Sequence, residues 1–261
     1  MIRKPLEIRP IAGALGAEIT GLDLTEELDG ETISAIRRAW LDHLVIFFRE
    51  QHLAPEQFLG FARRFGEVVE YPFIKGIDGF PEITRVLNLE HESVKFAGLW
   101  HTDAAYLECR PMGTMLLARK VPPFGGDTLF ANMYLAYETF VRGMRRLLDG
   151  LVAVNSSAKA DVTKTREDRL RDAAKADAHR EYVAEHPVVR THPETGRKAL
   201  YVNGGHTVRF QAASGIHLPL PLGSRLDRLL GQSLRPAQPD QRLPRHRRVM
   251  HRVTLAGDQP H

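Results

Sequence analysis

The chain has 261 residues, of which 43% are hydrophobic and 26% charged, and these are the proportions of a folded globular protein. Lysine and arginine total 36 and aspartate and glutamate 32, so the net charge of +4 is too small to indicate a nucleic-acid partner. The single cysteine, Cys109, excludes an internal disulfide, and the longest strongly apolar run, residues 44–48, is too short to cross a membrane. We therefore expect a cytoplasmic protein with no membrane partner.

The first part of the chain alternates between strand-like and helix-like patterns. Residues 8–19 favour extended structure, residues 31–41 have helical spacing, and residues 44–48 predict a buried strand. A helix should begin at Pro55, since proline suits a first turn, and end near Gly66. Its phenylalanines at positions 58, 61 and 65 fall on one face and predict core packing.

From residue 83 onward the pattern favours short strands. We expect strands at 83–87, 113–119, 128–131, 188–191 and 199–202, helices at 134–148 and 165–184, and a hairpin turn at 192–196. No βαβ repeat and no glycine-rich phosphate loop is present. The pattern predicts one domain over residues 1–261, mainly β with flanking helices, as an antiparallel barrel or jelly roll.

The sharpest chemical feature is Trp100-His101-Thr102-Asp103. In an extended segment residues i and i+2 point to the same side, so His101 and Asp103 would present an imidazole and a carboxylate together. Iron(II) oxygenases use two histidines and one carboxylate as ligands, and zinc also accepts both types. The pair therefore supplies part of a metal site.

Two further motifs follow in the chain, Gly125-Gly126-Asp127-Thr128 and Arg247-Arg248-Val249-Met250-His251-Arg252. In this order, after Trp-His-x-Asp, they resemble the taurine dioxygenase (TauD/TfdA) family of iron(II)- and 2-oxoglutarate-dependent dioxygenases. The resemblance covers most of the chain from Ile8 to about Phe210 and resumes at Arg247. It implies a double-stranded β-helix, which is a jelly roll of the cupin-like type.

The resemblance also implies roles for individual residues. His101 and Asp103 match iron ligands, and Thr128 and Arg248 match residues that bind 2-oxoglutarate. A guanidinium suits that role because it pairs bidentately with a carboxylate. Arg252 matches an arginine that contacts an anionic substrate, such as taurine, an alkylsulfonate, a sulfate ester or a carboxylate. The implied reaction hydroxylates this substrate with O2 and yields succinate and CO2, in a homodimer or homotetramer.

The segment before Arg248 departs from the family pattern. The family's second histidine ligand lies about eleven residues ahead of this arginine, where Ala237 stands here. Residues 231–245 contain three prolines and little strand character, so we expect the core to be shortened there. A metal ligand is therefore missing from its expected place.

Several histidines could replace it. His246 is the nearest candidate, because it lies two residues before Arg248 and shares its face of a strand. His251 falls on the opposite face, and His206 matches a family position in the substrate pocket or core. His186 and His192 suit packing and turn positions. Two alternatives stay open: an impaired family member that binds anions without turnover, and a zinc-dependent hydrolase built on the His-x-Asp pair.

Overall fold

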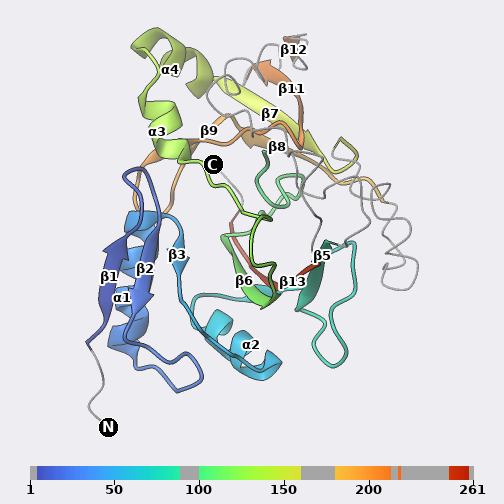
Figure 1. The fold of residues 1–261 in the computed structure, drawn as a ribbon. Helices are drawn as coiled ribbons and strands as arrows, with labels where there is room; N and C mark the ends of the chain where they lie inside the picture. The colour runs from blue at the N-terminus through green and yellow to red at the C-terminus, as the bar shows by residue number, and fades with distance from the viewer. Residues whose placement is uncertain (1–4, 89–99, 160–179, 213–216, 219–246, 259–261) are drawn as a thin grey trace.

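A computed structural model describes residues 5–88, 100–159, 180–212, 217–218 and 247–258 (Figure 1). The helices in these ranges are α1 (Gly30–His43), α2 (Pro55–Arg63), α3 (Met133–Glu138) and α4 (Arg142–Asp149). The strands are β1 (Glu7–Pro10), β2 (Ala17–Thr20), β3 (Ile46–Phe47), β4 (Val68–Val69), β5 (Thr84–Asn88), β6 (Gly113–Lys120), β7 (Leu151–Ser156), β8 (Val183–Pro187), β9 (Val189–Thr191), β10 (Lys198–Leu200), β11 (Thr207–Ala212), β12 (His217–Leu218) and β13 (Arg248–Leu255).

The N-terminal part forms a small sheet and two helices. β2 pairs antiparallel with β1 and parallel with β3. Helix α1 begins after Asp29, whose carboxylate accepts a hydrogen bond from the backbone of Thr32 at 2.7 Å and so caps the first turn. Helix α2 begins at Pro55 as predicted, and Phe58 and Phe65 are buried.

Strand β13 is the centre of the sheet that carries the site. It pairs antiparallel with β6 along one edge and with β5 and β4 along the other. Because successive side chains alternate, Val253 and Leu255 face the core formed by α1 and α2. Arg248 and Arg252 therefore share the opposite face of β13.

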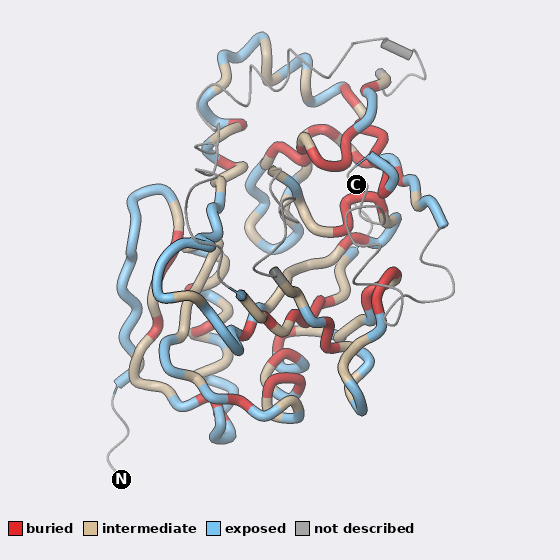
Figure 2. Tube along the Cα trace, turned by 45° about the vertical axis from the view of Figure 1, so that its right-hand side comes forward, coloured by how far each residue is buried: buried red, intermediate tan, exposed pale blue. Residues whose placement is uncertain are grey.

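A second antiparallel sheet has the order β12-β11-β7-β8, and β9 and β10 form a hairpin beside it. In Figure 1 this sheet lies above the sheet of β5, β6 and β13. The segment 100–112 contacts both, because Gly205 before β11 donates to the carbonyl of Trp100 at 3.2 Å and Thr114 of β6 reaches Asp103 at 3.3 Å. Figure 2 shows buried residues gathered in the interior and an exposed stretch beside the N-terminus.

The structure corrects several predicted elements. Residues 128–131 are not a strand, because Gly125 and Gly126 adopt positive φ values and turn the chain away from the sheet. The helix predicted over 134–148 is two helices, since Val141 is extended between α3 and α4. The strand predicted over 44–48 is limited to β3.

The predicted helix 165–184 falls largely on residues outside the described part of the chain. Its last two positions, Val183 and Ala184, belong to strand β8. The predicted strands near β5, β6, β9 and β10 are confirmed, as is the hairpin turn at 192–196. Within the described ranges, no helix has the length and apolar character needed to span a membrane.

Candidate metal and anion site

His101 and Asp103 lie next to each other where the segment 100–103 enters a turn. The Nε2 atom of His101 is 3.3 Å from the Oδ1 atom of Asp103, and the following Ala104 has φ 51°. Two donors that bind one ion at about 2.1 Å with angles of about 90–110° lie about 3.0–3.4 Å apart. The observed separation therefore fits two ligands of one metal ion.

The second oxygen of Asp103 faces strands β6 and β13. Oδ2 accepts a hydrogen bond from Thr114 Oγ1 at 3.3 Å and lies 3.7 Å from Arg252 Nη1. Burial alone would raise the pKa of the Asp103 carboxyl, but the hydrogen bond with His101 and the charge of Arg252 hold this pKa well below its usual range. Asp103 is therefore an ionised carboxylate, suited to metal ligation, that its neighbours hold in place.

Arg252 is a buried cation, and its residue is 7% exposed. Its guanidinium lies over the ring of Tyr71, 4.3 Å from the centroid, and the Tyr71 hydroxyl lies 3.3 Å from that of Tyr106. The Nε atom of Arg252 is buried and has no hydrogen-bond partner among the described residues. A buried guanidinium with an unused donor has capacity for a further anionic ligand.

A cavity of about 100 Å³ lies against the Asp103–Arg252 pair. Both residues line it, together with Tyr71 and with Cys109 on the segment that follows Asp103. Most of its remaining wall is apolar: Val69, Pro72, Ala104, Leu107, Pro111, Ala256 and Gly257. The space is small and can enclose only a compact group beside the ion pair.

Arg248 and Thr128 meet as the sequence motifs require. Arg248 Nη2 donates to Thr128 Oγ1 at 3.0 Å. Gly126 allows the chain to turn here because its φ is +76°, a conformation that residues with a Cβ rarely adopt. The two glycines thus act by backbone conformation, and the hydroxyl and guanidinium form a polar pair on the face of β13 that carries Arg252.

The turn before β11 contains His206, which the resemblance relates to the substrate pocket or core, and Gly205, for which the sequence predicts no role. A Cβ built on Gly205 would lie 3.0 Å from the Cβ of His101, so this turn packs directly on the predicted ligand. His206 is buried, with its ring centroid 4.9 Å from that of Tyr106 and 6.2 Å from that of His101. Burial, followed by the charge of His101, lowers the pKa of His206 to about 4, so this imidazole is neutral near pH 7.

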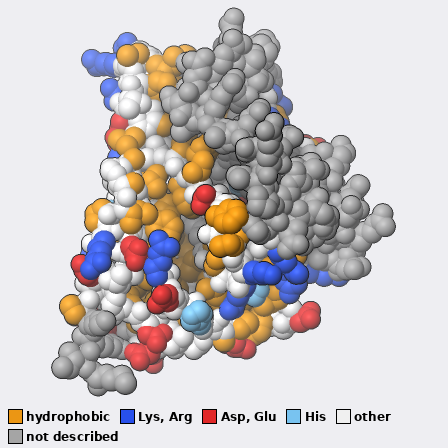
Figure 3. Space-filling view, in the orientation of Figure 1, with side chains coloured by type: hydrophobic (Ala, Val, Ile, Leu, Met, Phe, Trp, Pro, Cys, Tyr) orange, Lys and Arg blue, Asp and Glu red, His pale blue; other side chains and the backbone are white. Residues whose placement is uncertain are grey.

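The candidate third ligand, His246, lies outside the described residues. In the described ranges, no three His, Cys, Asp or Glu side chains come together closely enough to hold a metal ion. His251 lies on the opposite face of β13, as expected, and its Nδ1 atom accepts from Arg119 Nε at 3.1 Å. Figure 3 shows lysine and arginine side chains gathered at the lower right of this face of the molecule.

Two other histidines have structural contacts. His186 is buried in β8, with Nε2 2.9 Å from the carbonyl oxygen of Leu107. His192 accepts hydrogen bonds from the backbone of Glu194 and Thr195 in the hairpin turn. These contacts agree with the packing and turn positions expected for them.

Comparisons with known proteins decide the family. The model of the taurine catabolism dioxygenase TauD, TfdA family matches residues 7–237. The chain belongs to this family. A TauD/TfdA relative, an alpha-ketoglutarate-dependent sulfate ester dioxygenase from Pseudomonas putida, is 36% identical over 282 residues that cover 98% of this chain and 91% of the relative. That alignment is longer than this chain, so the relative has residues without a counterpart here.

Two more matches extend the comparison. An alkylsulfatase from Acinetobacter baylyi is 36% identical over 208 residues, which cover 77% of this chain and 63% of the relative. The crystal structure of a taurine dioxygenase from Burkholderia xenovorans superposes with a TM-score of 0.73 at 28% identity and covers 98% of this chain and 90% of that one. The predicted TauD/TfdA resemblance, jelly-roll fold and dioxygenase class are confirmed.

Proposed function

We propose that this chain is an iron(II)- and 2-oxoglutarate-dependent dioxygenase that hydroxylates a small organic anion. One observation carries the proposal. Arg248 and Arg252 lie on the same face of β13, where Arg248 is hydrogen-bonded to Thr128 and Arg252 forms an ion pair with Asp103. Four residues of a strand span about 13 Å, so the two guanidiniums can bind two different anions without bringing them together. A 2-oxoglutarate carboxylate and a substrate anion fit this arrangement.

His101 and Asp103 would hold the iron, with His246 proposed as the third protein ligand. The bound iron and O2 supply oxidation of a C–H bond, coupled to conversion of 2-oxoglutarate to succinate and CO2. Asp103 is prepared for ligation because Thr114 and Arg252 fix its second oxygen. Gly205, in the turn before β11, packs against His101.

The chain's own residues bind and orient the two organic anions. Arg248 would pair with the distal carboxylate of 2-oxoglutarate, and the Thr128 hydroxyl, which already accepts from Arg248, would donate its proton to the same carboxylate. Arg252 would pair with the substrate anion at the cavity beside Asp103, whose wall is mostly apolar but also includes Glu70 and Thr254. The reacting carbon would thereby lie near the predicted metal ligands.

The substrate class follows from Arg252 and from the relatives. Three related proteins act on organic anions: a sulfate ester dioxygenase, an alkylsulfatase and a (S)-phenoxypropionate/alpha-ketoglutarate-dioxygenase from Sphingobium herbicidovorans, the last 30% identical over 75% of this chain and 70% of its own length. We infer a sulfate ester, sulfonate or carboxylate of small size as substrate. The zinc-hydrolase alternative gives no purpose to the Arg248–Thr128 pair.

The first experiment is anaerobic addition of iron(II) and 2-oxoglutarate to the purified chain, with detection of the weak visible charge-transfer band of the chelate. The band should form with the wild type and be absent with Asp103→Ala, and sulfate esters, sulfonates and carboxylates should then stimulate succinate formation. A folded wild-type chain that forms no band would support the impaired alternative. His246→Ala, which should weaken the band, tests the third ligand.

A further inference from the structure

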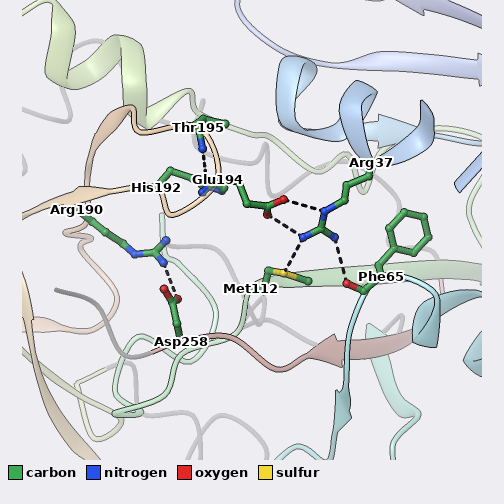
Figure 4. A network of polar contacts seen from close by, with 8 residues as sticks. All are labelled: Arg37, Phe65, Met112, Arg190, His192, Glu194, Thr195 and Asp258. Carbon is green, nitrogen blue, oxygen red and sulfur yellow. Dashed lines mark hydrogen bonds and ion pairs between the residues drawn. The ribbon is translucent and has the colours of Figure 1, made fainter. Parts of the chain in front are cut away.

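Asp258, three residues beyond the end of β13, joins three separate segments of the chain. Its Oδ1 atom accepts hydrogen bonds from Arg190 Nη2 of β9 at 2.6 Å and from Arg110 Nη2 at 3.2 Å. Figure 4 shows the contact between Arg190 and Asp258. One carboxylate oxygen therefore links the hairpin of the second sheet, the end of the segment that carries His101, and the end of β13.

Arg110 depends on this carboxylate because it is buried. Its side chain is 7% exposed, and its guanidinium lies over the ring of Tyr201, 4.8 Å from the centroid. Its Nε atom is buried without a hydrogen-bond partner in the described part of the chain. Removal of the Asp258 charge would leave this buried cation beside Arg190 without its carboxylate partner, which is unfavourable even though the Asp258 side chain is 46% exposed and water offsets part of the cost.

Backbone contacts transmit the position of Asp258 to the same segment. The amide of Met112 donates to the carbonyl of Leu255 at 3.1 Å. A Cβ built on Gly257 would lie 2.1 Å from the carbonyl oxygen of Arg110, so the two backbones are in close contact. The segment from Ala104 to Arg110 thus connects Asp103 to this junction.

We propose that Asp258 is a positioning residue for the metal site: through Arg110 and Arg190 it holds the segment that carries His101 and Asp103 in register with β13 and its two arginines. Asp258 is not assigned as a ligand of the metal or of either anion; it would act through its contacts with Arg110 and Arg190. The inference rests on the proposed function, because Asp258 can affect metal binding only if His101 and Asp103 are the metal ligands.

The test uses the full chain with Asp258→Asn, Asp258→Glu and a matched control, Asp149→Asn. Asp149 is also a carboxylate with two donors, Tyr137 Oη at 2.9 Å and Lys198 Nζ at 3.0 Å, but it joins α3 and β10 to the end of α4. Cobalt(II) serves as the metal probe, and its affinity is measured from visible absorption. Backbone hydrogen exchange of peptides within 100–112 is measured without metal.

Asp258→Asn should weaken cobalt(II) binding about 10- to 100-fold, which is the range for loss of a residue that orients a metal ligand. It should also accelerate exchange within 104–112 on the order of ten-fold or more, since each 1.4 kcal/mol of lost local stability corresponds to ten-fold. Asp258→Glu, which keeps the charge, should recover most of both properties. Asp149→Asn should leave both near the wild type.

The proposal is overturned if the Asp258→Asn variant shows the same rate of hydrogen exchange within 104–112 as the wild type. It is also overturned if Asp149→Asn changes hydrogen exchange and cobalt(II) affinity as much as Asp258→Asn does. If the wild type binds no cobalt(II), the proposed function fails, whereas hydrogen exchange still decides whether Asp258 holds the segment. Should Asp258→Asn not fold, Arg110→Met provides the second variant. It removes the same ion pair, retains an apolar side chain over Tyr201, and should change exchange and cobalt(II) binding in the same direction.

Discussion

The Nη1 atom of Arg252 lies 3.7 Å from Oδ2 of Asp103, so one ion pair connects the residue assigned to the substrate anion with a residue assigned to the metal. Thr114 completes the contact on the same oxygen, and Tyr71 covers the guanidinium from the side. In the proposed site, the substrate anion and the metal ligand Asp103 would therefore share the Arg252 cation. Binding of an anion at Arg252 changes the charge that Asp103 experiences, which couples the two sites.

Replacement of Arg252 should separate anion binding from 2-oxoglutarate binding. Arg252→Met keeps an unbranched apolar stem but removes the guanidinium. Since hydrogen bonds to charged groups contribute about 1.5–3 kcal/mol, the KM for an anionic substrate should rise about 10- to 100-fold. Steady-state assays of succinate formation with varied substrate measure this change. The KM for 2-oxoglutarate should rise much less, through the loss of the contact with Asp103 alone, and an equal rise in both constants would contradict separate anion sites.

Replacement of Arg248 should have the complementary effect. Arg248→Ala removes the partner of Thr128 and the proposed contact with the distal carboxylate of 2-oxoglutarate. The 2-oxoglutarate concentration for half-maximal rate should rise on the order of ten-fold or more, while thermal unfolding stays unchanged because Arg248 is only partly buried. Arg248→Lys should fall between, since a lysine pairs with a carboxylate without the bidentate geometry. Unchanged dependence on 2-oxoglutarate would remove Arg248 from this role.

The sequence predicts the residues whose local spacing determines their geometry. His101 and Asp103 are two positions apart, and Arg248 and Arg252 are four apart on a strand, so both pairs could be placed on common faces. The strands β5 and β6 and the turn at 192–196 carry clear local patterns as well. These features depend on periodicity and turn chemistry within a few residues.

The contacts that complete the site arise from distant segments. Tyr71 reaches the site from the segment just after β4, Thr114 from β6 and Gly205 from the turn before β11, and no local motif marks them. The break between α3 and α4 also escaped the helical pattern, because the apolar spacing of 134–148 continues across an extended Val141. Such contacts depend on how distant strands pair and pack, and the local propensities of a sequence do not specify that pairing.

Gly205 provides a test of how tightly the second sheet holds the metal ligand. Gly205→Ala would place a Cβ 3.0 Å from the Cβ of His101, so His101 or the turn must shift by a few tenths of an ångström. Since a metal site tolerates little displacement of its ligands, cobalt(II) affinity should fall several-fold, about 3- to 30-fold. Gly143→Ala is the matched control, because nothing lies within 4 Å of its Cβ position in α4. Equal affinity of both variants would show that the turn yields without moving His101.

Arg37 and Glu194 form a second long-range contact, which affects stability rather than the site. Two hydrogen bonds of 2.8 Å join the guanidinium and the carboxylate, and Arg37 also reaches the Phe65 carbonyl at 3.2 Å and Met112 (Figure 4). The contact fastens the hairpin turn at 192–196 to α1 and the end of α2. Glu194→Gln removes the charge while keeping the shape of the side chain.

Both side chains of this pair are about one-third exposed, at 32% for Arg37 and 35% for Glu194, so solvent screens the pair. The free energy of unfolding should fall by only about 0.5–1 kcal/mol, and the melting temperature by about 1–4 °C. Thermal unfolding followed by circular dichroism measures the shift. Glu7→Gln, which breaks the exposed pair with Arg9, should leave the melting temperature unchanged. A Glu194→Gln shift no larger than that of Glu7→Gln would mean that the Arg37–Glu194 pair does not stabilise the fold.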